Sequence, residues 1–190
     1  IRASSANFNN EIGLPLTILG EWQDTDGAFF WFKAILSSFF KLLWKDRHYP
    51  ELLILEYGID APGDMRKLLE IVRPNLGVVT AIGEIPVHIE FFSGRDSLVR
   101  EKSKLVGVLP ATGFAVLNAD DSAVLEMKNN TRAHTVTFGF TESADVRISN
   151  FENHLENNSS YVTFKLNYAG SFVPIRLNGV LGKSQGYAAA

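Results

Sequence analysis

"ELLILEYGIDAPGDMRKLLEIV", residues 51–72, has the pattern of a strand, a turn and a helix. Its first seven residues are a largely apolar run, which is typical of a parallel strand covered on both faces. Pro62, Gly63 and Asp64 then form a helix start, and apolar residues recur at helical spacing up to Val72. Glu56 lies near the end of the apolar run, where a charge needs a binding partner.

The same alternation of strand and helix continues to about residue 133. Apolar strands are predicted at 76–83 and 113–118, and helical patterns follow them at 96–109 and from 119 onward. Alternating strands and helices predict an α/β fold with a mostly parallel sheet flanked by helices.

Beyond residue 133 the pattern changes, because strand-like segments follow one another without helices between them. We expect these segments to form an antiparallel strand extension of the same domain in its C-terminal third. They are "HTVTFGF", "ADVRISNF", "SYVTFKLNY" and "FVPIRLNG".

The bulk composition excludes several classes of protein. The chain has 190 residues, of which 46% are hydrophobic and 21% are charged, as in ordinary globular domains. A net charge of −3 gives no electrostatic basis for nucleic-acid binding. The absence of cysteine excludes disulfides and thiolate chemistry, and it is compatible with a reducing, cytoplasmic location.

The most apolar stretch is "AFFWFKAILSSFFKLLW", residues 28–44, which is interrupted by Lys33, Ser37, Ser38 and Lys41. It is shorter than the roughly 20 residues that a membrane-spanning helix needs, so we expect no spanning segment. We expect a helix that packs on this domain or on a neighbouring one. The alternative is a helix that lies on a membrane surface.

Polar residues follow three of the predicted strands: Glu56, the loop 80–88 and the segment 118–121. Ligands of open α/β sheets bind beyond the carboxyl ends of the strands, so these residues are candidates for one site. Glu56 and His88 are credible ligands of a divalent cation, although each also has an ordinary structural interpretation.

Two further segments have both a functional and a structural interpretation. The amide-rich "NFNNEIG", residues 7–13, either binds a polar ligand or forms Asx turns and caps a helix. Lys102, in a predicted helix, has the pattern of a solvated charge when it is taken alone.

Several motifs resemble those of the bacterial Mur ligases, in particular the members that add D-alanyl-D-alanine. These are "SSANFNNEIGLPLTIL", "LLILEYGIDAPGD", "VVTAIGEIPVHIEFF", "VREKSKLVGVLPATGFAVLNADD" and "LGKSQGYAAA". They occur in the family's order and approximate spacing, and the resemblance fails only for residues 20–48.

The resemblance implies the central, ATP-binding domain of a three-domain ligase, with a sheet like that of the P-loop NTPases. No P-loop motif occurs in the chain, since the stretch that ends in "GKS", residues 182–184, has Leu177 where the first glycine is required. We therefore expect a fragment, residues 1–190, from which the P-loop segment and the N- and C-terminal domains are absent, and which is inactive alone.

The activity implied by the resemblance is ATP-dependent amide-bond formation in peptidoglycan precursor synthesis. The substrates would be UDP-N-acetylmuramoyl-tripeptide, activated as an acyl phosphate, and D-alanyl-D-alanine, with Mg²⁺ as the metal. The implied protein is a cytoplasmic monomer.

The resemblance also assigns residue roles. Glu56 and His88 would hold Mg²⁺, and Lys102, rather than Lys104, would be carbamylated and act beside the metal. Asn118 and Gln185 would contact the nucleotide, although "GKSQGYAA" departs from the family's "G-x-H-N-x-x-N-A". The residues expected to bind the UDP-muramoyl peptide are Ser4, Asn7, Asn9 and Asn10.

Two alternatives remain open. Another ligase of the Mur and folylpolyglutamate synthase superfamily would use a different acceptor, and "NFNNEIG" argues against it. A non-catalytic nucleotide-binding or scaffold domain would have kept the fold without the chemistry, which the presence of Glu56, His88 and Lys102 argues against.

Overall fold

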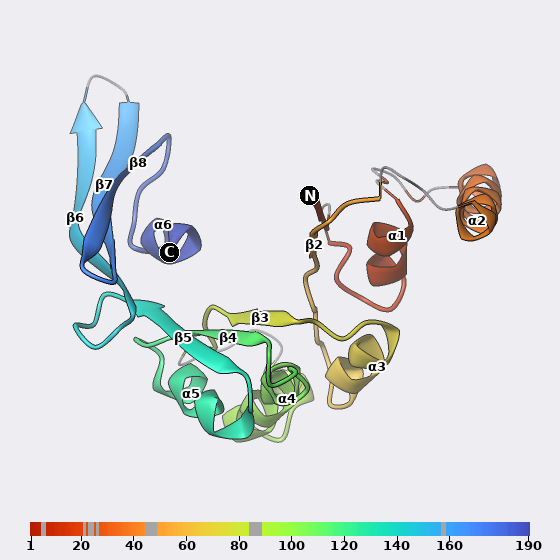
Figure 1. The fold of residues 1–190 in the computed structure, drawn as a ribbon, viewed down its shortest axis with the longest axis horizontal. Helices are drawn as coiled ribbons and strands as arrows, with labels where there is room; N and C mark the ends of the chain where they lie inside the picture. The colour runs from red at the N-terminus through yellow and green to blue at the C-terminus, as the bar shows by residue number, and fades with distance from the viewer. Residues whose placement is uncertain are drawn as a thin grey trace. The chain divides into compact units, whose positions relative to one another are not determined.

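A computed structural model describes residues 1–4, 7–20, 22, 25, 27–44, 49–83, 89–156 and 159–190. The chain divides into two compact units, Ile1–Val72 and Arg73–Ala190, and each is described by itself (Figure 1).

The first unit contains a two-stranded parallel sheet and three helices. The strands are β1, Arg2–Ala3, and β2, Leu53–Ile54. The helices are α1, Gly13–Leu19, α2, Ala28–Leu43, and α3, Asp64–Ile71. α1 and α3 contact each other, and their buried side chains form the core of this unit: Leu14, Leu16, Met65, Leu68 and Leu69.

The prediction of a long buried strand at 51–57 is wrong. β2 has two residues and pairs with β1, not with the larger sheet. Leu52 and Ile54 remain 51% and 54% exposed. The short segment at the N-terminus donates to the backbone carbonyls of Leu52 and Ile54 and so offers pairing for only this part of the apolar run. The predicted helices at 28–44 and 64–72 are confirmed as α2 and α3.

The second unit is built on a six-stranded sheet in the sequential order β3-β4-β5-β6-β7-β8. The strands are Leu76–Val79, Phe114–Asn118, His134–Gly139, Val146–Glu156, Ser159–Tyr168 and Ser171–Asn178. The helices of this unit are η1, Ile89–Phe91, α4, Arg95–Gly107, α5, Ser122–Leu125, η2, Glu126–Asn130, and α6, Ser184–Ala189.

Strands β3 to β6 pair in parallel, and β6, β7 and β8 pair antiparallel. The mostly parallel α/β fold with an antiparallel C-terminal extension is therefore confirmed. The expectation that "HTVTFGF" belongs to the antiparallel part is wrong, because β5 is parallel to both of its neighbours. The turns of α5 and η2 lie between β4 and β5 and return the chain in the direction that a parallel partner needs.

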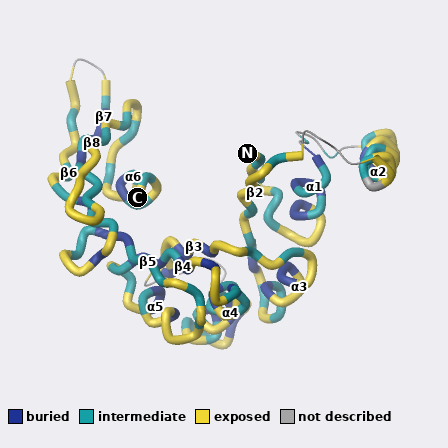
Figure 2. The backbone as a smooth tube through the Cα atoms, viewed as in Figure 1, coloured by how far each residue is buried: buried dark blue, intermediate teal, exposed yellow. Residues whose placement is uncertain are grey.

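Two groups of buried residues stabilise this unit, and buried residues are dark blue in Figure 2. One is formed by α4, α5 and η2 with the parallel strands, through Leu98, Val106, Leu117, Val124 and Met127. The other lies on the antiparallel strands, where Ile148, Val162 and Phe164 are covered by residues that include Tyr187 of α6.

The turn between β7 and β8 consists of Ala169 and Gly170, with φ angles of 50° and 80°. Positive φ at both central residues is the conformation of the primed turns, whose twist matches that of the two strands they connect.

Candidate functional site

Glu56 follows β2 and has an exposed carboxylate. The side-chain amide of Asn9 donates to Glu56 Oε1 over 3.2 Å, and the Glu56 backbone N–H donates to Ser4 Oγ over 3.3 Å. Ser4 and Asn9, predicted from one motif, are thus brought together with Glu56, predicted from another.

Gly58 permits this arrangement, because its backbone N–H donates to the Asn9 carbonyl oxygen over 2.7 Å. A Cβ at position 58 would lie 2.6 Å from Asn9 Cγ, well inside van der Waals contact. The glycine therefore keeps the Asn9 amide beside Glu56.

The other two asparagines of the segment have different surroundings. Asn10 Oδ1 accepts hydrogen bonds from the backbone N–H groups of Ile12 and Gly13, at 3.1 and 2.9 Å. This Asx turn leads into α1, so the structural interpretation of the amide-rich segment holds for Asn10. Asn7 is exposed, and its backbone carbonyl accepts from the Asn9 N–H.

In the second unit, Asp121 connects by hydrogen bonds two loops at the carboxyl ends of β3 and β4. Its Oδ2 accepts from the N–H groups of Ile82 and Gly83, at 2.8 and 3.1 Å. Its Oδ1 accepts from the N–H groups of Ala123 and Val124, which makes it the N-cap of α5. Burial acts to raise the pKa of Asp121, but these backbone donors outweigh it and lower the pKa below its ordinary value.

Asn118 and Asp120 join the same strand ends. The buried Asn118 amide donates to the Thr80 carbonyl over 2.7 Å, and Asn118 Oδ1 accepts from the Asp120 N–H. Asp120 in turn accepts hydrogen bonds from the N–H groups of Phe140 and Thr141 and from the Tyr187 hydroxyl. Burial, together with the Asp120 carboxylate, raises the pKa of Tyr187 to about 12.

Lys102 and Lys104 have different environments on α4. Lys102 is half-buried, and burial lowers the pKa of its amine, an effect that the negative charge of Asp121 partly offsets. Lys104 is exposed and pairs with the buried Glu101 carboxylate, with 2.6 Å between Nζ and Oε2. Burial favours the neutral amine at Lys102, whereas Lys104 forms an ordinary ion pair within the helix.

Arg95 is a member of this junction that the sequence reasoning missed. Its Nε donates to the Gly83 carbonyl over 3.0 Å, and its guanidinium lies 3.9 Å from Asp121 Oδ1. The position of Arg95 in the sequence could have indicated this role. A cation in the first turn of a helix is unfavourable beside the helix dipole, so Arg95 needs an anionic partner.

Comparisons with known proteins agree with this architecture. The family model described as the Mur ligase middle domain matches residues 38–184. The chain belongs to the Mur ligase family.

Its relatives include the UDP-N-acetylmuramoyl-tripeptide–D-alanyl-D-alanine ligase of Mycobacterium bovis. The two are 31% identical over 144 residues, which are 76% of this chain and 23% of the relative. The UDP-N-acetylmuramoyl-L-alanyl-D-glutamate–2,6-diaminopimelate ligase of Chlamydia caviae is 29% identical, over 93% of this chain and 34% of the relative. A crystal structure of MurF from Acinetobacter baumannii has the same fold, with a TM-score of 0.72 and 21% identity over 98% of this chain and 34% of that one. The chain thus spans about a quarter to a third of these proteins.

The nucleotide-site predictions of this Mur ligase domain fall on two elements. Asn118 ends β4 and has both ends of its amide bonded within the chain. Gln185 lies half-buried in α6, after a turn in which the Gly182 N–H donates to Asn153 Oδ1 over 2.8 Å. Both remain predictions.

The magnesium prediction concerns Glu56, His88 and Lys102. His88 lies outside the described residues, and within the described ranges no group of three or more His, Asp or Glu side chains is placed to hold a metal. The exposed Glu56 carboxylate nevertheless suits Mg²⁺, which prefers hard oxygen ligands. In the second unit, Lys102 is a half-buried lysine of lowered pKa, which suits conversion to a carbamate.

Proposed function

We propose that this chain is the ATP-binding domain of a longer ligase that joins D-alanyl-D-alanine to UDP-N-acetylmuramoyl-tripeptide through an acyl phosphate. Family membership supports ATP-dependent ligation, and the similarity to the D-alanyl-D-alanine ligase of Mycobacterium bovis supports this pair of substrates. The ligase would be a cytoplasmic monomer. Among the described residues, no helix is long and apolar enough to cross a bilayer.

The environment of Lys102 carries the proposal for the site. A neutral lysine amine can attack CO₂ and release a proton, which converts a cation into a carbamate anion. Burial lowers the pKa of Lys102 and so increases the neutral fraction that this reaction needs. The same change would replace a charge that repels Mg²⁺ with one that binds it.

The remaining roles follow from the surroundings of each side chain. Glu56, with His88, would hold Mg²⁺, while Ser4 and Asn9 orient Glu56 and, with Asn7 and Asn10, face the muramoyl peptide. Mg²⁺ neutralises charge on the phosphates of ATP. Asn118 and Gln185 would position the nucleotide.

A ligase for another acceptor is the second candidate, because the Chlamydia caviae relative, named for 2,6-diaminopimelate, is 29% identical over 93% of this chain. The amide-rich "NFNNEIG" segment favours the D-alanyl-D-alanine reaction.

The test is phosphate release from ATP by the protein that carries all three family domains. Release that requires Mg²⁺, UDP-N-acetylmuramoyl-tripeptide and D-alanyl-D-alanine together would support the proposal. Release that depends on a different amino acid would support the second candidate, and ATP binding without turnover would contradict both.

Three lysine variants test the site. We expect Lys102→Ala and Lys102→Arg to lose more than about 100-fold in activity, because neither can form the carbamate. Lys104→Ala should lose no more than about fivefold per folded molecule, since its ion pair lies apart from the reaction. Similar small losses in all three variants would contradict the role of Lys102.

A further inference from the structure

Helix α2 turns one face toward the rest of its unit. Ala34 is 4% exposed, and the Phe30 ring packs edge-on against Trp22, with 5.3 Å between the ring centroids. About two turns beyond Ala34 on this face, Lys41 Nζ donates to the Leu19 carbonyl over 2.7 Å. The covered face of α2 is therefore narrow and includes Phe30, Ala34 and Lys41.

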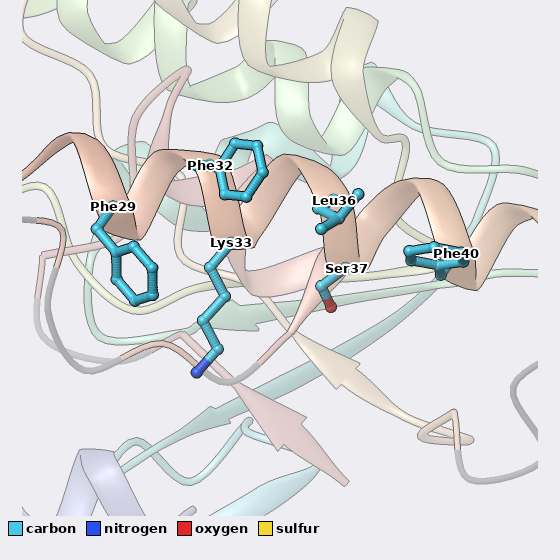
Figure 3. Close-up of a pocket in the computed structure, with 6 residues that line it drawn as sticks. All are labelled: Phe29, Phe32, Lys33, Leu36, Ser37 and Phe40. Atoms are coloured by element: carbon cyan, nitrogen blue, oxygen red, sulfur yellow. The ribbon is translucent and has the colours of Figure 1, made fainter.

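The opposite face of α2 is apolar and exposed. Phe29 is 79% exposed and Ile35 is 68% exposed. Figure 3 shows Phe29, Phe32, Leu36 and Phe40 following one another along the helix, with Lys33 among them. The other exposed apolar residues of this segment are Trp31, Phe39, Leu43 and Trp44. A surface helix of a globular protein normally has the reverse pattern, so a further surface is needed to cover this face.

The charges of α2 indicate what that surface is. The chain as a whole has a net charge of −3, yet residues 28–44 contain two lysines and neither Asp nor Glu. Lys33 is exposed beside the apolar face, and Trp31 and Trp44 are the aromatic type that is enriched at membrane–water interfaces. An apolar aromatic face with cations and no anions is complementary to an anionic lipid surface.

We propose that α2 docks this Mur ligase domain on the surface of an anionic phospholipid bilayer, with the helix lying in the plane of the interface. At 1.5 Å per residue its 16 residues extend about 24 Å, less than the roughly 30 Å of a hydrocarbon core. The helix therefore lies on the bilayer and does not cross it. This proposed membrane contact does not depend on which amino acid the ligase adds.

Two other surfaces could cover this face. A neighbouring domain of the longer ligase is one, and in that case the protein that carries all three family domains would not float with anionic vesicles. A second copy of the chain would need about 800 Å² of surface on each partner, whereas one face of a 24 Å helix offers a few hundred. It would also bring two Lys33-bearing surfaces of like charge together.

Flotation of the 190-residue chain with lipid vesicles tests the proposal. We expect the chain to float with vesicles of equal parts phosphatidylcholine and phosphatidylglycerol, and more weakly with phosphatidylcholine alone. Phe32→Glu combined with Leu36→Glu should lower the partition coefficient at least about tenfold, because it places two charges on the apolar face. Glutamate is a good helix former, so far-UV circular dichroism should be unchanged.

Two further variants separate the apolar and electrostatic contributions. Leu155→Glu is the matched control, since Leu155 is 76% exposed on β6 and lies in the other unit, and its partition should equal that of the wild type. Lys33→Glu should weaken binding to the anionic vesicles several-fold and leave binding to phosphatidylcholine nearly unchanged. Brominated lipids should quench the fluorescence of the bound wild type through Trp31 and Trp44.

Three results would overturn the proposal. The first is a wild-type chain that fails to float with anionic vesicles. The second is an equal loss of flotation in Leu155→Glu, which would indicate nonspecific adsorption. The third is a dimer in light scattering that the Phe32→Glu/Leu36→Glu variant converts to a monomer without any vesicle binding, which would assign the face to a second copy.

Discussion

Glu56 after β2 and Asp121 after β4 are both carboxylates near the end of a parallel strand, and their surroundings differ. Asp121 accepts four backbone N–H groups and has a side chain that is 12% exposed. Glu56 is exposed and accepts from the side chain of Asn9. The comparison separates two roles. The Asp121 carboxylate has its hydrogen-bonding capacity filled by backbone N–H groups and stabilises the fold, whereas the Glu56 carboxylate is exposed, is oriented by Asn9 and is available to a ligand.

The largest expected effect on stability is that of Asp121→Ala. Its removal leaves backbone donors of two loops without their acceptor, so we expect the free energy of unfolding of the second unit to fall by about 3 kcal/mol. All three tryptophans lie in the first unit, so their fluorescence reports on that unit. The urea transition seen by far-UV circular dichroism should therefore shift, and the fluorescence transition should not.

The pH dependence of this variant sharpens the comparison. The pKa of Asp121 is lowered in the folded state, so its contribution to stability is complete above its unfolded pKa of about 4 and is lost as the pH falls through the folded value. Stability of Asp121→Ala should vary less over that acidic range.

Glu142→Ala is the control, because its exposed ion pair with Arg147 should contribute less than 1 kcal/mol. Equal losses in both variants would contradict the special role of Asp121.

A smaller effect is expected for Tyr187→Phe. This change removes the hydroxyl that donates to Asp120 over 2.9 Å and keeps the ring packing, so about 1 kcal/mol of stability should be lost. Hydrogen exchange of the α6 amides should measure the change. Unaltered α6 protection would mean that the ring contacts of Tyr187, with Phe138 and Phe140, hold this helix without the hydroxyl.

The smallest effect on stability is expected for Glu56→Gln. Because Glu56 is exposed, we expect the free energy of unfolding of the first unit to change by less than about 0.5 kcal/mol. Tryptophan fluorescence in urea measures it. In the ligase assay, the same variant should require a higher Mg²⁺ concentration. A stability loss of the size expected for Asp121→Ala would break the distinction between the two carboxylates.

The parts of the fold that the sequence predicts well are those where periodicity and breakers agree. Asp64 to Val72 and Asp96 to Leu109 combine helical spacing with nearby prolines, and α3 and α4 form there. The strand at 51–57 could not be predicted correctly from its apolar composition, because strand length depends on a pairing partner distant in sequence. The direction of β5 was missed for a related reason: alternation shows which face is buried, whereas direction is set by the preceding α5–η2 connection.

The candidate site divides in the same way. The capping role of Asp121 was predictable, because an aspartate directly before a short helix favours an N-cap. The hydrogen bond between Asn9 and Glu56 depends on Gly58 and on contacts between residues far apart in the sequence. A local sequence pattern does not show such contacts. The difference between Lys102 and Lys104 depends on burial, which two lysines two positions apart on one helix do not reveal by sequence.

The Ala169–Gly170 turn has a consequence for the order in which the sheet is assembled. β7 and β8 are neighbours in sequence, and hairpins of this kind close in roughly 1–10 μs. Pairing of β3 with β4 instead requires Gly77 to find Ala115 across the whole of α4, which costs loop entropy before any contact forms. The antiparallel strands, although they leave the ribosome after the parallel ones, should therefore reach their native pairing first and present β6 as a preformed edge onto which the parallel strands assemble.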